Sequence, residues 1–175
     1  MNKKILLPGI LLVLLGCNPT EKSQKNALSY FDLKGYFDKE ALRLTQSNPL
    51  VTKTVAVNQQ TETKQVRMTD WAKELSVFSN ADINRNAWKG LFDAKNTGQQ
   101  FLYTSDHEKV PVKEVLVTKK NGRISAIRIL IIYSNILYKS ADTLSYYPDS
   151  LYQVKKKQQI KLLSEKNYTI TGRFK

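Results

Sequence analysis

The sequence predicts an α+β fold: an N-terminal helix, a β-hairpin and short helices, then an antiparallel strand meander that forms a curved sheet packed on the helices. Three observations support this prediction. Helical spacing of apolar residues is confined to the region before Gly98, and alternation of apolar and polar residues dominates the region after it. Between two of the expected strands, Asn121-Gly122 supplies a two-residue hairpin turn.

The first helix is expected over residues 27–46. Its apolar positions recur every three or four residues and form one stripe, which we expect to face the core. The residues of that stripe are Tyr30, Leu33, Phe37, Ala41 and Leu44. Ser47-Asn48-Pro49 ends the helix, because the residue before a proline is pushed out of the helical region.

A β-hairpin is expected next, with strands at residues 50–57 and 64–68. Both segments alternate between apolar and polar residues, and the polar residues 58–63 between them indicate a longer loop. The apolar residues expected to pair across the hairpin are Val55 and Val57 with Val66 and Met68.

Two short helices are expected between the hairpin and residues 96–98. Thr69 is the expected N-cap of the first helix, because threonine at this position accepts a hydrogen bond from a free backbone N–H. The apolar stripe of this helix is Trp71, Leu75 and Phe78. Residues 80–82 interrupt the pattern, which restarts in the second helix with the stripe Ile83, Ala87 and Leu91.

The rest of the chain is expected to form antiparallel strands. Their ranges are Gln100–Thr104, Val110–Lys119, Arg123–Ser134, Asn135–Tyr146, Leu151–Leu163 and Tyr168–Phe174. For residues 151–163 a weakly amphipathic helix is the alternative. The strand at residues 123–134 is apolar on both sides, which predicts a central strand covered on both faces near residues 129–132.

The start of the chain has the order of a secretory signal peptide. Lys3 and Lys4 precede an apolar run that ends at Leu15, and Gly16 is the small residue expected before a cleavage site. As a helix this run rises only ~16 Å, against ~30 Å of bilayer hydrocarbon, so it is too short for a permanent span. The segment Leu14-Leu15-Gly16-Cys17 resembles the lipobox of bacterial lipoproteins. This resemblance implies cleavage after Gly16 and diacylglyceryl transfer to the sulfur of Cys17.

The lipobox resemblance divides the chain into three parts. Residues 1–16 are expected to be the signal peptide, residues 17–26 the lipidated cysteine and its tether, and residues 27–175 a single α+β domain. Two or three acyl chains anchor a protein far more firmly than one. The expected partner of Cys17 is therefore a membrane, and the expected location is the outer membrane, facing the periplasm.

Three further segments are similar to segments of uncharacterised lipoproteins of Bacteroidota. These segments are Tyr30–Phe37, Thr69–Leu75 and Ala81–Asn84. The similarity spans most of the mature chain and implies an envelope location, but it implies no activity. The order of strands and helices also looks like that of the half-barrels that carry or receive lipoproteins in the bacterial envelope, which is a likeness of architecture only.

The chain is strongly basic, with a formal net charge of +13, of which +11 remains after Lys3 and Lys4 are removed. A basic surface increases solubility, and it also attracts anionic lipid or polysaccharide of the envelope. Both interpretations stay open. Nucleic acid is not an expected partner, because the signal peptide directs the chain out of the cytoplasm.

The residues of catalytic and metal sites are scarce. His107 is the single histidine, it lies in a polar segment, and we expect it in an exposed turn. With Cys17 acylated, a zinc site built from cysteine and histidine is excluded, and no metal or cofactor is expected. Paired carboxylates of a hydrolase remain an alternative, because such partners meet only in the folded chain.

Tyrosines gather in the strand-rich half of the chain. They are Tyr133, Tyr138, Tyr146, Tyr147, Tyr152 and Tyr168. On a sheet these side chains either pack against their cross-strand neighbours or line a groove for an acyl chain, peptide or glycan. The sequence leaves both alternatives open.

The function expected from the sequence is that of a non-enzymatic binding or interaction module of the cell envelope, facing the periplasm. The first alternative is a carrier that handles lipids or lipoproteins in an apolar half-barrel cavity, and the second is a hydrolase of envelope polymers. A filled core favours the interaction module. An open apolar cavity between sheet and helices favours the carrier, and carboxylates clustered in a cleft favour the hydrolase.

Overall fold

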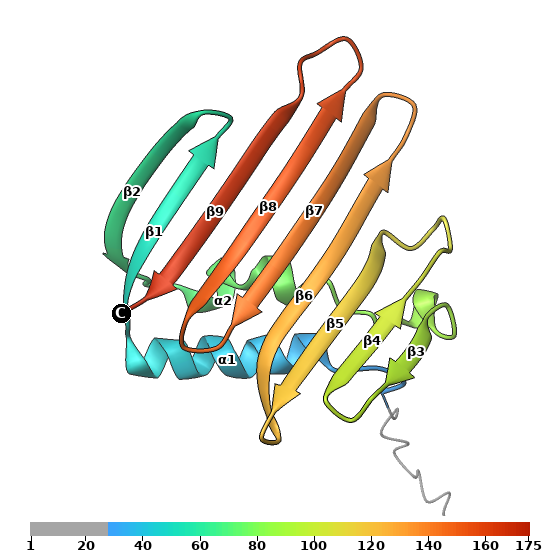
Figure 1. The fold of residues 1–175 in the computed structure, drawn as a ribbon, viewed down its shortest axis with the longest axis horizontal. Coiled ribbons are helices and arrows are strands. Elements are labelled where there is room, and N and C mark those ends of the chain that lie inside the picture. The colour runs from blue at the N-terminus through green and yellow to red at the C-terminus, as the bar shows by residue number, and fades with distance from the viewer. Residues whose placement is uncertain (1–27) are drawn as a thin grey trace, which may run out of the picture.

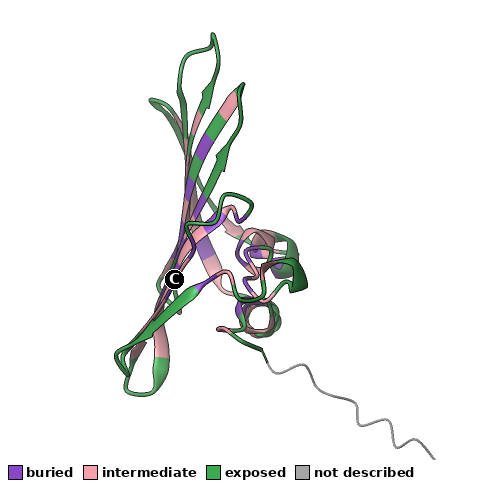
Figure 2. Cartoon of the chain, turned by 90° about the vertical axis from the view of Figure 1, so that its right-hand side faces the viewer, coloured by how far each residue is buried: buried purple, intermediate pink, exposed green. Residues whose placement is uncertain are grey.

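The computed structural model describes residues 28–175. The expected signal peptide, Gly16, Cys17 and the tether through residue 26 lie outside the described residues, so their assignments stay predictions. The described chain forms one open antiparallel sheet with the strand order β2-β1-β9-β8-β7-β6-β5-β4-β3 (Figure 1). All helices lie on one face of this sheet (Figure 2), as the α+β prediction required.

The elements follow one another in the predicted general order. The helices are α1 (Leu33–Ser47), α2 (Trp71–Glu74), α3 (Ser76–Ser79) and the 3₁₀ helix η1 (Asn86–Trp88). The strands are β1 (Leu50–Val57), β2 (Gln60–Arg67), β3 (Asp93–Asn96), β4 (Gln100–Thr104), β5 (Val112–Lys120), β6 (Arg123–Ser134), β7 (Tyr138–Tyr147), β8 (Leu151–Ile160) and β9 (Lys166–Phe174). We call the end of the sheet with turns 121–122 and 148–150 its base, and the opposite end, with turns 58–59, 135–137 and 161–165, its upper end.

Helix α1 begins at Leu33, not at residue 27. Asp32 is its N-cap, and the Asp32 carboxylate accepts a hydrogen bond from the Gly35 N–H at 2.8 Å. Tyr30 lies before the helix, where its hydroxyl accepts a hydrogen bond from the Gly90 N–H at 3.1 Å. The other four residues of the predicted stripe are buried, as expected: Leu33, Phe37, Ala41 and Leu44.

The predicted register of the first hairpin is wrong. Val57 pairs with Gln60, and Val51 rather than Val55 faces Val66. The connection is only two residues long, because Asn58 adopts a left-handed conformation with φ of 53° that suits a tight turn. Residues 60–63, which were expected in the loop, therefore belong to strand β2.

The second short helix expected after residue 80 does not form; only the 3₁₀ turn η1 appears there. The Asn84 side chain instead accepts a hydrogen bond from the Tyr30 N–H at 3.0 Å and donates one to the Phe31 carbonyl at 3.1 Å. These long-range bonds hold the backbone in an irregular path. The chain then enters β3, a strand that the sequence analysis missed.

The first short helix has Asp70 as its N-cap in place of Thr69, and the Asp70 carboxylate accepts a hydrogen bond from the Lys73 N–H at 2.8 Å. The predicted apolar residues Trp71, Leu75 and Phe78 are all buried. They continue from α2 into α3, which starts directly after Leu75.

Most of the meander agrees with the predicted strands. Strands β4 and β6 have the expected bounds, and Asn121 and Gly122 form the tight turn with φ of 52° and 76°. Residues 151–160 form strand β8, so the helical alternative is excluded. β6 is central, but the prediction of cover on both faces is wrong: Ile132 is exposed on the face where the described chain places no helix.

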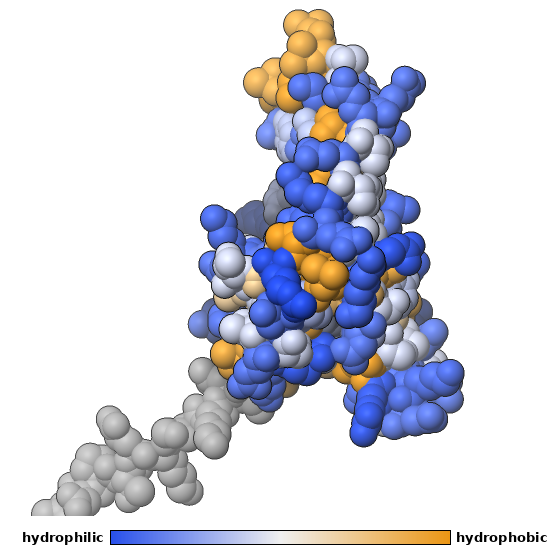
Figure 3. All heavy atoms as spheres, turned by 90° about the vertical axis from the view of Figure 1, so that its left-hand side faces the viewer, coloured by the Kyte–Doolittle hydropathy of each residue, from blue (hydrophilic) through white to orange (hydrophobic). Residues whose placement is uncertain are grey.

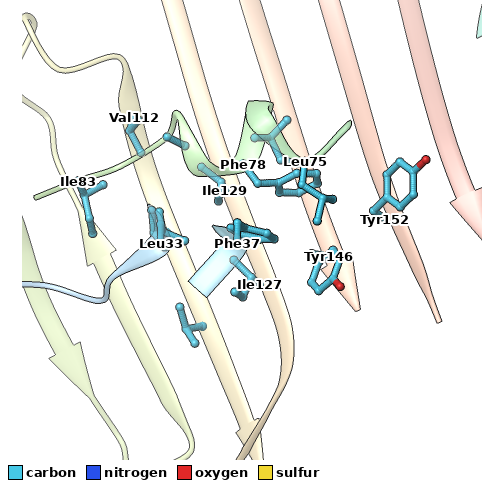
Figure 4. Close-up of a cluster of buried hydrophobic side chains, with 14 of the residues drawn as sticks. Leu33, Phe37, Leu75, Phe78, Ile83, Val112, Ile127, Ile129, Tyr146 and Tyr152 are labelled. Carbon is cyan, nitrogen blue, oxygen red and sulfur yellow. The ribbon is translucent and has the colours of Figure 1, made fainter. Parts of the chain in front are cut away.

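The core lies between the helices and the lower half of the sheet (Figure 2), and Figure 4 shows a cluster of its buried side chains. Phe37 of α1 packs against Phe78 of α3 and Tyr146 of β7, with ring centroids 4.9 and 5.2 Å apart. α1 lies at the base, where the Arg43 guanidinium is 2.8 Å from the Asp149 carboxylate.

Among residues 28–175, no helix is both long and apolar enough to cross a bilayer.

The strands continue beyond the helices toward the upper end of the sheet (Figure 2). There no element of residues 28–175 covers the face that carries the helices lower down. Successive strand residues point to opposite faces, so the same rows of side chains that form the core also continue into this open part. The boundary between the covered and uncovered parts forms the candidate site.

Candidate ligand-binding groove

A groove runs along α3, where this helix faces the sheet. It consists of two adjoining hollows of about 590 and about 510 Å³, which share Val77, Asp142 and Lys156 in their walls. Volumes of this size are typical of small-molecule sites. The apolar residues that line the larger hollow are Val77, Tyr152, Val154, Tyr168 and Ile170.

The apolar wall of the groove is produced by strand register. Val154 of β8 pairs with Ile170 of β9, and Ile170 pairs with Val55 of β1. Paired residues in antiparallel strands project to the same face, so these side chains form a row across three strands. Because α2 and α3 cover only the lower part of the face, the row remains half-buried rather than buried.

A charged cluster around Glu74 of α2 forms part of the wall of the larger hollow. The Lys53 ammonium lies 2.7 and 2.9 Å from the two Glu74 oxygens, and the Tyr152 hydroxyl donates a hydrogen bond to the same carboxylate at 2.6 Å. Burial of the ring, together with this carboxylate, raises the pKa of Tyr152 above its ordinary value. Two strands thereby hold α2 to the sheet.

Tyr152 reaches Glu74 because its ring crosses the neighbouring strand at a glycine. Tyr152 pairs with Gly172 of β9, and Gly172 pairs with Lys53 of β1. An added Cβ at Gly172 would lie 2.2 Å from ring atoms of Tyr152. The absence of a side chain is therefore what gives the tyrosine its path.

A buried carboxylate lies between the two hollows. Asp142 of β7 is 5% exposed, and its carboxylate lies 2.9 Å from the Lys156 ammonium and accepts a hydrogen bond from the Ser140 hydroxyl. Partial burial lowers the pKa of Lys156, but the hydrogen bond and attraction of Asp142 outweigh it, so this pKa is raised. The groove thus has a fixed ion pair within an apolar wall.

The smaller hollow adds an aromatic and cationic edge. The Arg85 guanidinium lies over the Trp88 ring, 4.7 Å from its centroid. Ile131 and Tyr133 of β6 line the opposite side. Together the two hollows combine apolar surface with cations, which is the chemistry needed to hold an amphipathic molecule.

The sequence left open whether the six tyrosines pack against neighbouring strands or line a groove. The structure shows tyrosines of both kinds. Tyr146 is buried and donates a hydrogen bond to Glu40 at 2.5 Å, so it is a core residue. Tyr152 and Tyr168 line the larger hollow, and Tyr133 lines the smaller one. The remaining two tyrosines, Tyr138 and Tyr147, line neither hollow.

His107 lies in an exposed turn, as expected, where its Nδ1 accepts a hydrogen bond from the Lys109 N–H at 3.3 Å. Within residues 28–175, no three histidine, cysteine, aspartate or glutamate side chains gather closely enough to bind a metal ion. Gly16 and Cys17 lie outside the described residues.

Sequence reasoning missed the charged residues of the groove. Lys156 belongs to the run of three lysines at residues 155–157, and strand alternation turns Lys156 alone toward the helix side. Its partner Asp142 is visible only from the pairing of β7 with β8. The contacts of Glu74 with Lys53 and Tyr152 likewise exist only in the tertiary structure.

No family model, no curated protein and no solved structure matches this chain.

Proposed function

We propose that this chain is an envelope lipoprotein, anchored through Cys17, whose α+β domain binds the apolar part of an amphipathic ligand in the groove along α3. The groove is the observation that carries the proposal. The apolar lining of its larger hollow, of about 590 Å³, consists of the buried Tyr152 and of four half-buried side chains, Val77, Val154, Tyr168 and Ile170. An acyl chain is the ligand that best matches this lining. When it binds, the apolar surface of the chain and the apolar surface of the groove are both removed from water, which is favourable.

The groove supports binding better than catalysis. Each carboxylate in its wall is already engaged by a cation: Glu74 by Lys53, and Asp142 by Lys156. The core beneath the helices consists of buried side chains, while the hollow beside α3 is open and mainly apolar, which supports the carrier-like alternative over a plain interaction module. The open sheet with helices on one face is by itself compatible with a carrier and with an interaction module, so the apolar hollow is what favours the carrier.

The ligand site is tested by filling it. In Val77→Trp the indole would occupy the space between α3 and β8, and we expect affinity for a dansyl-labelled fatty acid to fall by at least about tenfold, or ~1.4 kcal/mol. Leu42→Trp is the size-matched control, because Leu42 is exposed on α1 outside the groove. Fluorescence titration measures both variants. Equal binding by the two variants, or no binding by the unmodified protein, contradicts the proposal.

The anchor is tested by mass. Cys17 is the only cysteine, so a thioether-linked lipid has one position available. We expect the purified protein to lack residues 1–16 and to carry acyl mass on Cys17, and Cys17→Ser to carry none. Mass spectrometry of membrane and soluble fractions makes the measurement. A free thiol at Cys17 in the mature protein, or an uncut leader, would show that the proposed anchor is wrong.

A further inference from the structure

Four large aliphatic side chains are exposed together at the upper end of the sheet. They come from the turns that follow β6 and β8, and they are between 60% and 97% exposed: Ile136, Leu137, Leu162 and Leu163. We call this group the apolar tip. Figure 3 shows hydrophobic side chains at this end of the molecule, beyond a largely hydrophilic surface.

The two turns of the apolar tip are held against each other by backbone contacts. The Lys161 N–H donates a hydrogen bond to the Leu137 carbonyl at 2.9 Å. The Asn135 side chain accepts hydrogen bonds from the N–H groups of Leu137 and Tyr138 at 2.9 and 2.8 Å. Leu162 has a φ of 69°, a left-handed conformation that is unfavourable for leucine. The turns therefore have a defined shape that points apolar residues outward.

The chain segments that carry the apolar tip are positively charged. Residues 134–139 and 157–166 contain four lysines and one glutamate, which gives a net charge of +3. The lysines are Lys139, Lys157, Lys161 and Lys166. The single acid, Glu165, lies 2.9 Å from the Lys157 ammonium, so it is already paired.

We propose that the apolar tip inserts into the interfacial region of a bilayer that contains anionic lipids. Exposed aliphatic groups gain free energy on leaving water, and clustered exposed groups mark an interaction surface. The lysines in the same segments match an anionic headgroup layer, since each lysine near such a surface adds attraction. The net charge of +3 around these exposed aliphatic groups complements the headgroups of an anionic bilayer, and we take that bilayer as the partner of the apolar tip.

Insertion also places the groove beside the bilayer, a consequence that rests on the proposed function. Gln158 lines the larger hollow, and its side-chain amide donates a hydrogen bond to the Tyr138 hydroxyl at 2.9 Å. Tyr138 directly follows Leu137 of the apolar tip. An acyl chain leaving the bilayer along the tip would thus reach the groove within the same face of the sheet.

Site-specific labelling tests insertion in the full chain carrying Cys17→Ser, where no other thiol is present. Leu162→Cys in this background receives an environment-sensitive bimane label. We expect the label to shift to shorter emission wavelength, and to be quenched by brominated lipid, when vesicles of phosphatidylglycerol and phosphatidylcholine are added. Vesicles of phosphatidylcholine alone, or added salt, should weaken the effect because screening reduces the attraction of the lysines.

The control is a label at Lys120→Cys in the same background. Lys120 lies at the β5–β6 turn, which is basic like the apolar tip but lacks aliphatic residues and is at the base of the sheet. We expect no shift there, and we expect Ile136→Ser with Leu163→Ser to reduce vesicle partitioning of the Leu162→Cys protein by at least about tenfold. A label at position 162 that stays in water, or an equal shift at position 120, overturns the proposal.

The experiment also separates this proposal from the proposed function. Val77→Trp fills the groove but leaves the apolar tip unchanged, so this variant should insert normally while it binds the fatty acid weakly. The double tip variant should show the reverse. If the tip does not insert but the groove still binds the fatty acid, only the tip proposal fails.

Discussion

Replacing Gly172 with alanine is expected to lower the free energy of unfolding by about 3 kcal/mol, at the upper end of the cost of overpacking a core. The new methyl group would lie 2.2 Å from the Cε1 and Cζ atoms of Tyr152. The Tyr152 ring cannot easily move aside, because it is 1% exposed and its hydroxyl is bonded to Glu74 at 2.6 Å. Urea denaturation followed by circular dichroism measures the change.

Two further variants make the Gly172 prediction specific. Thr169→Ala changes a residue of the same strand that points to the opposite face, and its cost should stay within about 0.5 kcal/mol. Tyr152→Val removes the ring that the new methyl group meets, so Gly172→Ala should cost much less in that background than alone. Strictly additive effects of the two substitutions, or a cost of Gly172→Ala below about 1 kcal/mol, contradict this explanation.

The second large effect is expected on stability when Lys156, the cation beside the buried Asp142 carboxylate, is replaced. Lys156→Met should destabilise the protein by about 2–3 kcal/mol, because it leaves the Asp142 carboxylate buried with only the Ser140 hydroxyl as a partner. We place the cost below that of a fully buried pair because the Lys156 side chain is 35% exposed. Thermal and urea unfolding at neutral pH give the measurement.

The neighbouring residue supplies a matched control. Lys157 is 63% exposed, points to the other face and pairs with Glu165, so Lys157→Met should cost less than about 1 kcal/mol. Combining Lys156→Met with Asp142→Leu replaces the ion pair by apolar groups and should restore most of the loss. The explanation fails if Lys157→Met is as damaging as Lys156→Met, or if the combined variant is no more stable than Lys156→Met.

The ion pair between Lys156 and Asp142 also predicts that the stability of the folded protein falls at alkaline pH. The pKa of Lys156 is raised in the folded protein, so its contribution is fully present below the ordinary lysine value of 10.5. That contribution is lost as the pH rises from 10.5 through the raised folded-state pKa. In this range Lys156 has already lost its proton in the unfolded chain but still holds it in the folded protein, so a rise in pH favours unfolding. Lys156→Met should lack this part of the alkaline stability loss.

Local sequence patterns predicted several elements correctly. The spacing of Leu33, Phe37 and Leu44 marked α1, because a stripe of this period has one buried face wherever the helix packs. Asn121-Gly122 marked the turn into β6, because these residues accept the left-handed conformations that a two-residue turn requires. Such signals act within a few residues and do not depend on the rest of the fold.

Sequence patterns predicted the wrong local structure where contacts between distant residues determine the backbone path. Residues 83–91 have helical spacing, yet hydrogen bonds from Asn84 to the segment before α1 hold them in an irregular path. In the first hairpin, alternation alone could not separate a six-residue loop from the two-residue turn at Asn58, because both connect alternating strands.

The sequence by itself determined the α+β class, the order of the main elements, the basic surface and the expectation of a lipid anchor at Cys17. Only the tertiary structure decided that α3 stops short of covering the sheet, that Asp142 meets Lys156, and that the turns carrying Leu137 and Leu162 lie together. The physical reason is that hydrophobic period and turn preference are properties of short segments. Strand register and helix placement, in contrast, are set by contacts between residues far apart in the chain, and the groove and the apolar tip exist only through those contacts.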